Sequence, residues 1–154
     1  MEGVSAAASI LQIVDLCARL GTGLYHLASS LQHLPADFRR KHHSVLELQQ
    51  AVDSIGADFR QPSPCPIRDR LPEDALLQLL HLLHESHKEA DGLEHALDDA
   101  LPQPDDSSFT RHRRTLRVMA KREDIQGRLD RLQELKSQLS IWYQHQLLTM
   151  ATSS

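Results

Sequence analysis

The sequence predicts an all-α protein, a bundle of four to five helices. Apolar residues recur every three or four positions over long stretches, glycine occurs only six times in 154 residues, and no alternating strand with hairpin signals is found. Hydrophobic residues make up 40% and charged residues 25% of the chain, which is typical of an ordered globular domain. Since aromatic residues are only 4%, the core must consist mainly of Leu, Ala, Ile and Val.

The first predicted helix, 3–34, carries a wide apolar surface. A helix that is apolar around most of its circumference is typically buried at the centre of a protein or meets a membrane. The uncharged run Gly3–Val14 is shorter than the about 20 residues that cross a bilayer, and no Lys or Arg precedes it as in a secretory leader. We therefore expect a cytoplasmic protein. The polar residues form one narrow stripe: Ser5, Ser9, Gln12, Asp15, Arg19, Thr22 and His26.

Further helices are predicted over 36–57, 72–101, 109–120 and 122–148, and together with the first they form one domain, 1–148. Two proline-containing loops interrupt them, and residues 149–154 are predicted to be a frayed tail or the start of a linker. The residues predicted to face the core are Phe38, Val45, Leu48, Val52, Ile55 and Phe59; Leu76, Leu80, Leu83, Ala90, Leu97 and Leu101; and Ile125, Leu129, Leu132, Leu135, Leu139 and Trp142.

Three histidines, His81, His84 and His87, are spaced so that neighbours share a helix face, and they are weak candidates for a metal site. The more common interpretation is a polar surface, because one helix rarely supplies all the ligands. Cys17 is expected to be a small buried side chain. No nucleophile elbow, phosphate-binding loop or dinucleotide fingerprint is present, so we expect neither an enzyme nor a bound cofactor.

An acidic stretch precedes a basic one in the second half of the chain. Neighbouring antiparallel helices that face each other would explain both, as would solvated surfaces with weak ion pairs. The functional interpretation is a basic patch for anionic lipid headgroups. Nucleic acid is not expected, because the patch lacks aromatic residues for base stacking. The patch consists of Arg111, Arg113, Arg114, Arg117, Lys121 and Arg122; the acidic residues are Glu85, Glu89, Asp91, Glu94, Asp98, Asp99, Asp105 and Asp106.

Three segments resemble the N-terminal helical domains of fungal STAND proteins, the NLR-like receptors in which a NACHT or related P-loop NTPase domain usually follows. The segments are GVSAAASILQIVDLCARLGTGLYHL within Gly3–Leu34, LPADFRRKHHSVLELQQAVDSI at Leu34–Ile55, and KREDIQGRLDRLQELKSQLSIWYQ at Lys121–Gln144. The resemblance is to the SesA and HeLo-like group and covers most of the chain. It implies a HeLo-like helical bundle, with an NTPase domain in cis if the chain is a fragment of such a receptor and without one if it is a standalone protein.

In that group the domain executes or transmits a regulated cell-death signal in non-self recognition, as in heterokaryon incompatibility, and the first helix acts on the membrane. The resemblance therefore implies a signalling domain that releases its first helix to protein partners, to further copies of itself or to an anionic membrane surface. The alternative is a non-lytic adaptor or regulatory domain, which Asp15 and Arg19 favour because they interrupt the apolar run. The residues implied in the helix are Val4, Ile10, Leu11, Ile13, Val14 and Leu16.

Overall fold

The structure is a computed structural model that describes residues 8–20, 22, 36–62, 70–98, 107, 113, 116 and 120–152, with side chains omitted for 36–42, 98 and 122. Within these ranges the chain forms a four-helix bundle without strands. Residues 8–20, hereafter the N-terminal helix, are followed by α2 (Ala36–Phe59), α4 (Glu73–Asp98) and α6 (Arg122–Thr152). The predicted all-α bundle is confirmed.

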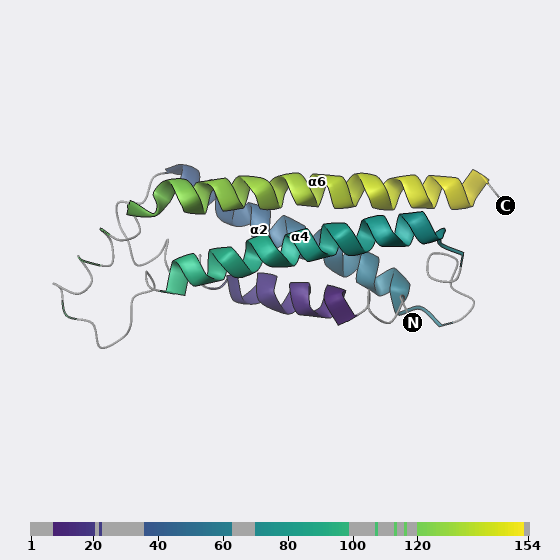
Figure 1. The fold of residues 1–154 in the computed structure, drawn as a ribbon, viewed down its shortest axis with the longest axis horizontal. Helices are drawn as coiled ribbons and strands as arrows, with labels where there is room; N and C mark the ends of the chain where they lie inside the picture. The colour runs from purple at the N-terminus through teal and green to yellow at the C-terminus, as the bar shows by residue number, and fades with distance from the viewer. Residues whose placement is uncertain are drawn as a thin grey trace.

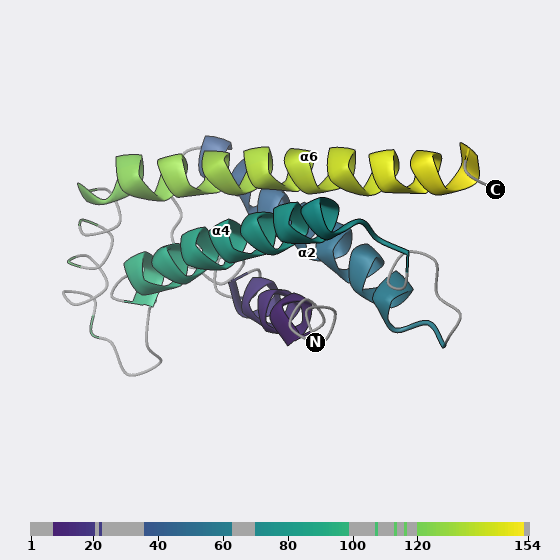
Figure 2. The ribbon, with the colours of Figure 1, turned by 45° about the vertical axis from the view of Figure 1, so that its right-hand side comes forward.

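The long helix α6 spans one side of the bundle, and the N-terminal helix lies on the opposite side of α4 (Figure 1). Figure 2 shows α2 crossing α6 obliquely, with the N-terminal helix again beyond α4. Contacts between helices define their directions. Helix α4 is antiparallel to α6, because Ala75 contacts Trp142 and Glu89 contacts Arg128. Helix α2 runs in the same sense as α6, since Lys136 pairs with Glu47 and Tyr143 with Asp58 further along both helices.

The core is mainly aliphatic, as the composition predicts, and it also contains Phe59 and Trp142. All six residues predicted on α6 are buried, and so are the predicted residues of α2 except Phe38, whose side chain lies outside the described ones. The buried residues of α6 are Ile125, Leu129, Leu132, Leu135, Leu139 and Trp142; those of α2 are Val45, Leu48, Val52, Ile55 and Phe59.

The predicted buried face of α4 is partly wrong. Leu76 and Leu80 are only half-buried at the edge of the core, and Leu101 lies outside the described residues. This helix has leucines on nearly every side of its first half, so apolar spacing alone does not select one face. Packing against α6 selects it instead. The residues of α4 that are buried are Ala75, Leu79, Leu82, Leu83, Ala90, Leu93, Ala96 and Leu97.

The ends of two helices also differ from the prediction. Helix α2 continues beyond residue 57 to Phe59, which is buried. Helix α6 continues to Thr152, so the predicted frayed tail at 149–154 is wrong for its first four residues. Met150 packs against the core, and the hydroxyls of Thr149 and Thr152 donate to backbone carbonyls one turn earlier. Most of the predicted helix 109–120 lies outside the described residues, although 113, 116 and 120 are helical.

Candidate functional site

The N-terminal helix packs on the bundle through one face only. Ile10, Ile13 and Leu16 are at most 2% exposed, and Cys17 and Leu20 are buried beside them. The opposite face is in solvent: Leu11 is 56% exposed, and Ala8, Ala18, Asp15 and Arg19 are exposed as well. Of the two locations expected for so apolar a helix, burial at the centre of the protein is therefore wrong. The helix is an outer element of the bundle.

The residues that the sequence places in the membrane or partner helix are thus divided by the fold. Ile10, Ile13 and Leu16 face the core, Val14 is half-buried against it, and Leu11 faces solvent. Val4 lies outside the described residues. The bundle therefore covers three of the six residues completely and a fourth in part.

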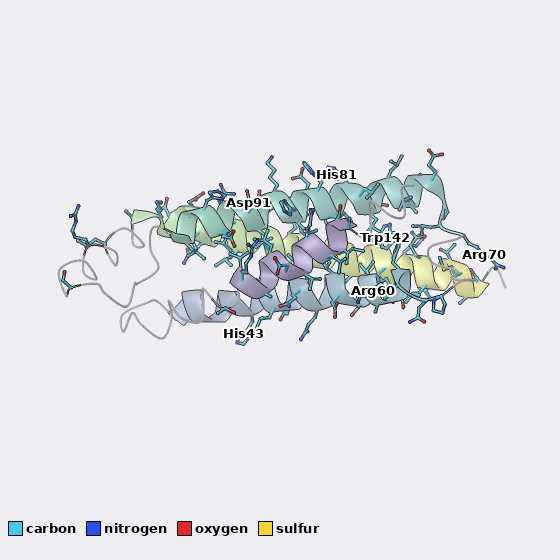
Figure 3. All side chains as sticks on the ribbon, turned by 90° about the horizontal axis from the view of Figure 1, so that it is seen from below. His43, Arg60, Arg70, His81, Asp91 and Trp142 are labelled. Atoms are coloured by element: carbon cyan, nitrogen blue, oxygen red, sulfur yellow. The ribbon has the colours of Figure 1, made fainter. Side chains whose placement is uncertain are left out.

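Ile10 packs directly against Gly56 of α2. Seen from below, the N-terminal helix lies between α4 and α2 (Figure 3). A Cβ atom added at Gly56 would lie 2.6 Å from Cγ2 of Ile10, closer than two carbon atoms can approach. Gly56 is itself buried within α2. The absence of a side chain at position 56 therefore allows the two helices to approach each other closely at this point.

An ion pair fixes the other end of the helix. Nε of Arg19 lies 3.6 Å from Oε2 of Glu94 on α4 and 3.7 Å from Oδ2 of Asp15, one turn earlier in the same helix. Glu94 has 27% of its side chain exposed, against 59% for Arg19 and 73% for Asp15. Among the described residues, the Arg19–Glu94 pair is the one polar contact that joins the N-terminal helix to another helix.

The thiol of Cys17 belongs to the same buried face. It is fully buried, as predicted, and its burial raises the pKa of the thiol to about 12. Because the thiolate is the reactive form, this environment keeps the thiol unreactive. Cys65, the second cysteine of the chain, lies outside the described residues.

The other three helices are joined by polar contacts on α6. The indole Nε1 of Trp142 donates to the carbonyl of Ala75 at 3.0 Å in the buried interior. The phenol of Tyr143 donates to Asp58 on α2. Burial, and secondarily this hydrogen bond and the carboxylate charge, raises the pKa of Tyr143 to about 12, because the charged phenolate is disfavoured there.

Two ion pairs add to these contacts. Nη1 of Arg128 lies 3.3 Å from Oε2 of Glu89, and Nζ of Lys136 lies 3.4 Å from Oε2 of Glu47. The guanidinium of Arg128 lies over Gly92, where a side chain would collide with it. Helix α6 therefore contacts both α2 and α4 through side chains with polar partners.

Three acidic residues of α4 pair with residues that do not belong to the predicted basic patch. Glu89 pairs with α6 and Glu94 with the N-terminal helix, while Asp91 lies 3.7 Å from Nδ1 of His95. Of the predicted basic patch, the structure describes two side chains: Arg113 is exposed and Lys121 is half-buried, and both make interactions. The side chains of Arg111, Arg114, Arg117 and Arg122 lie outside the described ones.

The histidines of α4 do not converge. His81, labelled in Figure 3, and His84 are exposed, and His87 is half-buried. In the part of the chain that the structure describes, no three His, Cys, Asp or Glu side chains are grouped as metal ligands. His81 and His84 therefore lie on the solvent-exposed surface of α4, and His87 lies at the edge of that surface.

Sequence reasoning missed Gly56 and Glu94, which hold the N-terminal helix. Gly56 lies inside α2, close to residue 57, where the sequence predicts that this helix ends. A glycine within a helical pattern does signal a close approach of another element, although it does not name that element. Glu94 belongs to the acidic stretch named above, but nothing in the spacing relates it to Arg19.

None of the helices in the described ranges is both long and apolar enough to cross a membrane. Comparisons with protein-family models, curated proteins and solved structures gave no match.

Proposed function

We propose that the chain is a signalling domain, of the kind found at the N-terminus of fungal STAND receptors, and that it acts by releasing its N-terminal helix. The observation that carries the proposal is the attachment of this helix. Its apolar face is buried as completely as the core of α6, yet a single ion pair is the polar contact that links it to the bundle in the described residues.

Release would change the surface of the protein in two ways. The free helix would present Ile10, Ile13 and Leu16 together with Leu11, which is already exposed. The bundle would present the vacated surface around Gly56. Both surfaces are apolar, and exposed apolar patches of this kind bind protein partners, further copies of the chain or lipid.

The charges on the helix allow it to act at a membrane surface without crossing the membrane. Asp15 and Arg19 are one turn apart and pair with each other, so the helix carries their compensating charges when it leaves. An amphipathic helix with such a polar side can lie in the interface between headgroups and acyl chains. In the proposed state the helix therefore lies on an anionic membrane surface or on a partner helix.

The non-lytic adaptor is the second candidate. It is favoured by the exposed position of Asp15 and Arg19 and by the lack of a spanning helix among those described. In this hypothesis the released helix binds another protein domain and makes no contact with lipid.

A reversible lock tests the proposal. Cγ2 of Ile10 is bonded directly to Cβ, so the Cβ positions at 10 and 56 are close enough for a disulfide, which requires about 4 Å. The variant Ile10→Cys/Gly56→Cys is made with Cys17→Ala and Cys65→Ser, so that only the new pair forms a disulfide. Circular dichroism establishes that the oxidised and reduced forms are folded.

Dye release from vesicles with and without phosphatidylserine, and molar mass by light scattering, are then measured for both forms. We expect release or self-association only after reduction, with the reductant leaving the wild-type protein unchanged. Self-association without dye release would select the adaptor. The proposal is wrong if the oxidised and reduced forms behave identically in both measurements.

A further inference from the structure

We propose that Gly56 and Glu94 form a two-point clasp that sets how often the N-terminal helix leaves the bundle. Gly56 receives Ile10 at one end of the helix, and Glu94 binds Arg19 at the other. The biological consequence of the clasp rests on the proposed function, but its existence is tested without lipid or partner.

The first point of the clasp is steric. Ile10 branches at Cβ, so its Cγ2 atom moves only with the χ1 rotamer or with the helix itself. A methyl group at position 56 would require Cγ2 to retreat from a separation of 2.6 Å to ordinary contact distance. Since Ile10 is 1% exposed and surrounded by the core, the helix as a whole must yield.

The second point is electrostatic and is present only in the docked state. Arg19 keeps Asp15 within reach whether the helix is docked or free, because both residues belong to that helix. Glu94 belongs to α4 and is lost to Arg19 when the helix leaves. The Arg19–Glu94 contact therefore favours docking, whereas the Arg19–Asp15 contact does not distinguish the two states.

Cys17 is an internal reporter of the clasp. Its side chain is fully buried against the bundle, so a thiol reagent reaches it only when the N-terminal helix opens or the whole domain unfolds. With Cys65→Ser in the background, the rate of labelling of Cys17 measures these openings. A matched probe, Leu139→Cys in the Cys17→Ala/Cys65→Ser background, places a thiol at a fully buried position of α6 and reports unfolding of the rest.

Two pairs of variants test the Glu94 point and the Gly56 point of the clasp separately. Glu94→Gln removes the charge that binds Arg19, and Glu89→Gln is its control, because Glu89 lies on the same helix but binds Arg128 of α6. We expect Glu94→Gln to accelerate labelling of Cys17 by up to about fivefold, the range of a partly exposed pair. Glu89→Gln is expected to leave it nearly unchanged. The exchanged pair Arg19→Glu/Glu94→Arg should label more slowly than Arg19→Glu alone.

Gly56→Ala adds the colliding methyl group, and Gly127→Ala is its control, since an added Cβ meets nothing within 4 Å at position 127. We expect Gly56→Ala to accelerate labelling of Cys17 about tenfold or more, as overpacking does, without changing the rate at position 139. Gly127→Ala should not accelerate either rate.

The clasp is wrong if Gly56→Ala and Gly127→Ala label Cys17 at the same rate, or if Glu94→Gln and Glu89→Gln do. It is also wrong if every variant changes the rates at positions 17 and 139 in parallel, since the helix would then open only with the whole domain. A clasp that passes these tests in a protein without dye release or self-association would contradict the proposed function alone.

Discussion

The N-terminal helix and α6 bury their apolar faces equally well but are attached differently. Helix α6 contacts α2 through Tyr143 and Lys136 and contacts α4 through Trp142 and Arg128. In the described residues, Arg19 makes the polar contact between the N-terminal helix and the bundle. At the other end of this helix, Ile10 packs against Gly56 of α2.

Burial alone does not distinguish the two helices, so we base the proposed difference between them on their polar contacts. Apolar burial is non-directional, and a buried face can transfer to another apolar surface of similar size. Hydrogen bonds and ion pairs are directional, so a helix that moves to another apolar surface loses them unless that surface offers partners in the same geometry. Under the proposed function, α6 is therefore the scaffold of the domain, and the N-terminal helix is the element that would be exchanged.

The largest effect is expected from truncating the scaffold. Leu132→Ala removes a fully buried side chain of α6 and should lower the free energy of unfolding by about 2–5 kcal/mol. Ile13→Ala removes an equally buried side chain of the N-terminal helix, and its main effect should be faster labelling of Cys17. Urea unfolding followed by circular dichroism, together with thiol labelling, measures both. Equal effects of the two variants on both measurements would remove the distinction between the helices.

Rising alkaline pH should weaken first the docking of the N-terminal helix and then the contact between α2 and α6. The pKa of Cys17 rises from 9.0 to about 12 on folding and that of Tyr143 from 10.0 to about 12, so each group favours the folded state while protonated. Stability from Cys17 is complete below pH 9 and that from Tyr143 below pH 10, and both are lost as the pH rises towards 12, because the unfolded chain ionises first.

We therefore expect undocking of the N-terminal helix above pH 9 and weakening of the α2–α6 contact above pH 10. Hydrogen exchange and urea unfolding between pH 8 and 12 check this order. Cys17→Ala should abolish the first loss and Tyr143→Phe the second. A loss of stability that is the same in both variants and in the wild type would show that neither group is responsible.

Trp142→Phe is expected to cost less. It keeps an aromatic ring in the core but removes the hydrogen bond to the carbonyl of Ala75, a contribution of about 1 kcal/mol. Urea denaturation should show a lower free energy of unfolding for the whole domain. Labelling of Cys17 should become faster only by the amount that this lower global stability explains. A selective increase in labelling of Cys17 would mean that Trp142 supports the N-terminal helix rather than α4.

The smallest effect is a gain. Gly127→Ala on the exposed side of α6 should stabilise the domain by about 0.5–1 kcal/mol, because alanine loses less backbone entropy in a helix and the added Cβ meets open space. Thermal unfolding measures the gain. A lower melting temperature would show that helix propensity at this position is outweighed by some other interaction.

The sequence predicts the scaffold better than the contacts between helices. On α6 the residues from Ile125 to Trp142 repeat every three or four positions with polar residues between them, so one face is unambiguous. On α4 the leucines surround the helix, and the face is decided by packing against α6. Extension of α6 to Thr152 depends on Met150 finding the core, which the terminal residues alone do not reveal.

For the candidate site, the sequence identifies the helix but not what holds it. The apolar residues Ile10, Ile13 and Leu16 stand out by composition, whereas the exposure of Leu11 follows from the peripheral position of the helix. The contact of Ile10 with Gly56 and that of Arg19 with Glu94 join distant parts of the chain, so they depend on the tertiary arrangement.

Native-state hydrogen exchange, resolved by peptide, tests most directly whether the N-terminal helix is detachable. We expect amides in residues 8–20 to exchange through an opening of low free energy and weak urea dependence, while those of α6 exchange only through global unfolding. If residues 8–20 and α6 share one opening free energy and one urea dependence, the helix does not leave on its own, and the distinction between scaffold and detachable element is wrong.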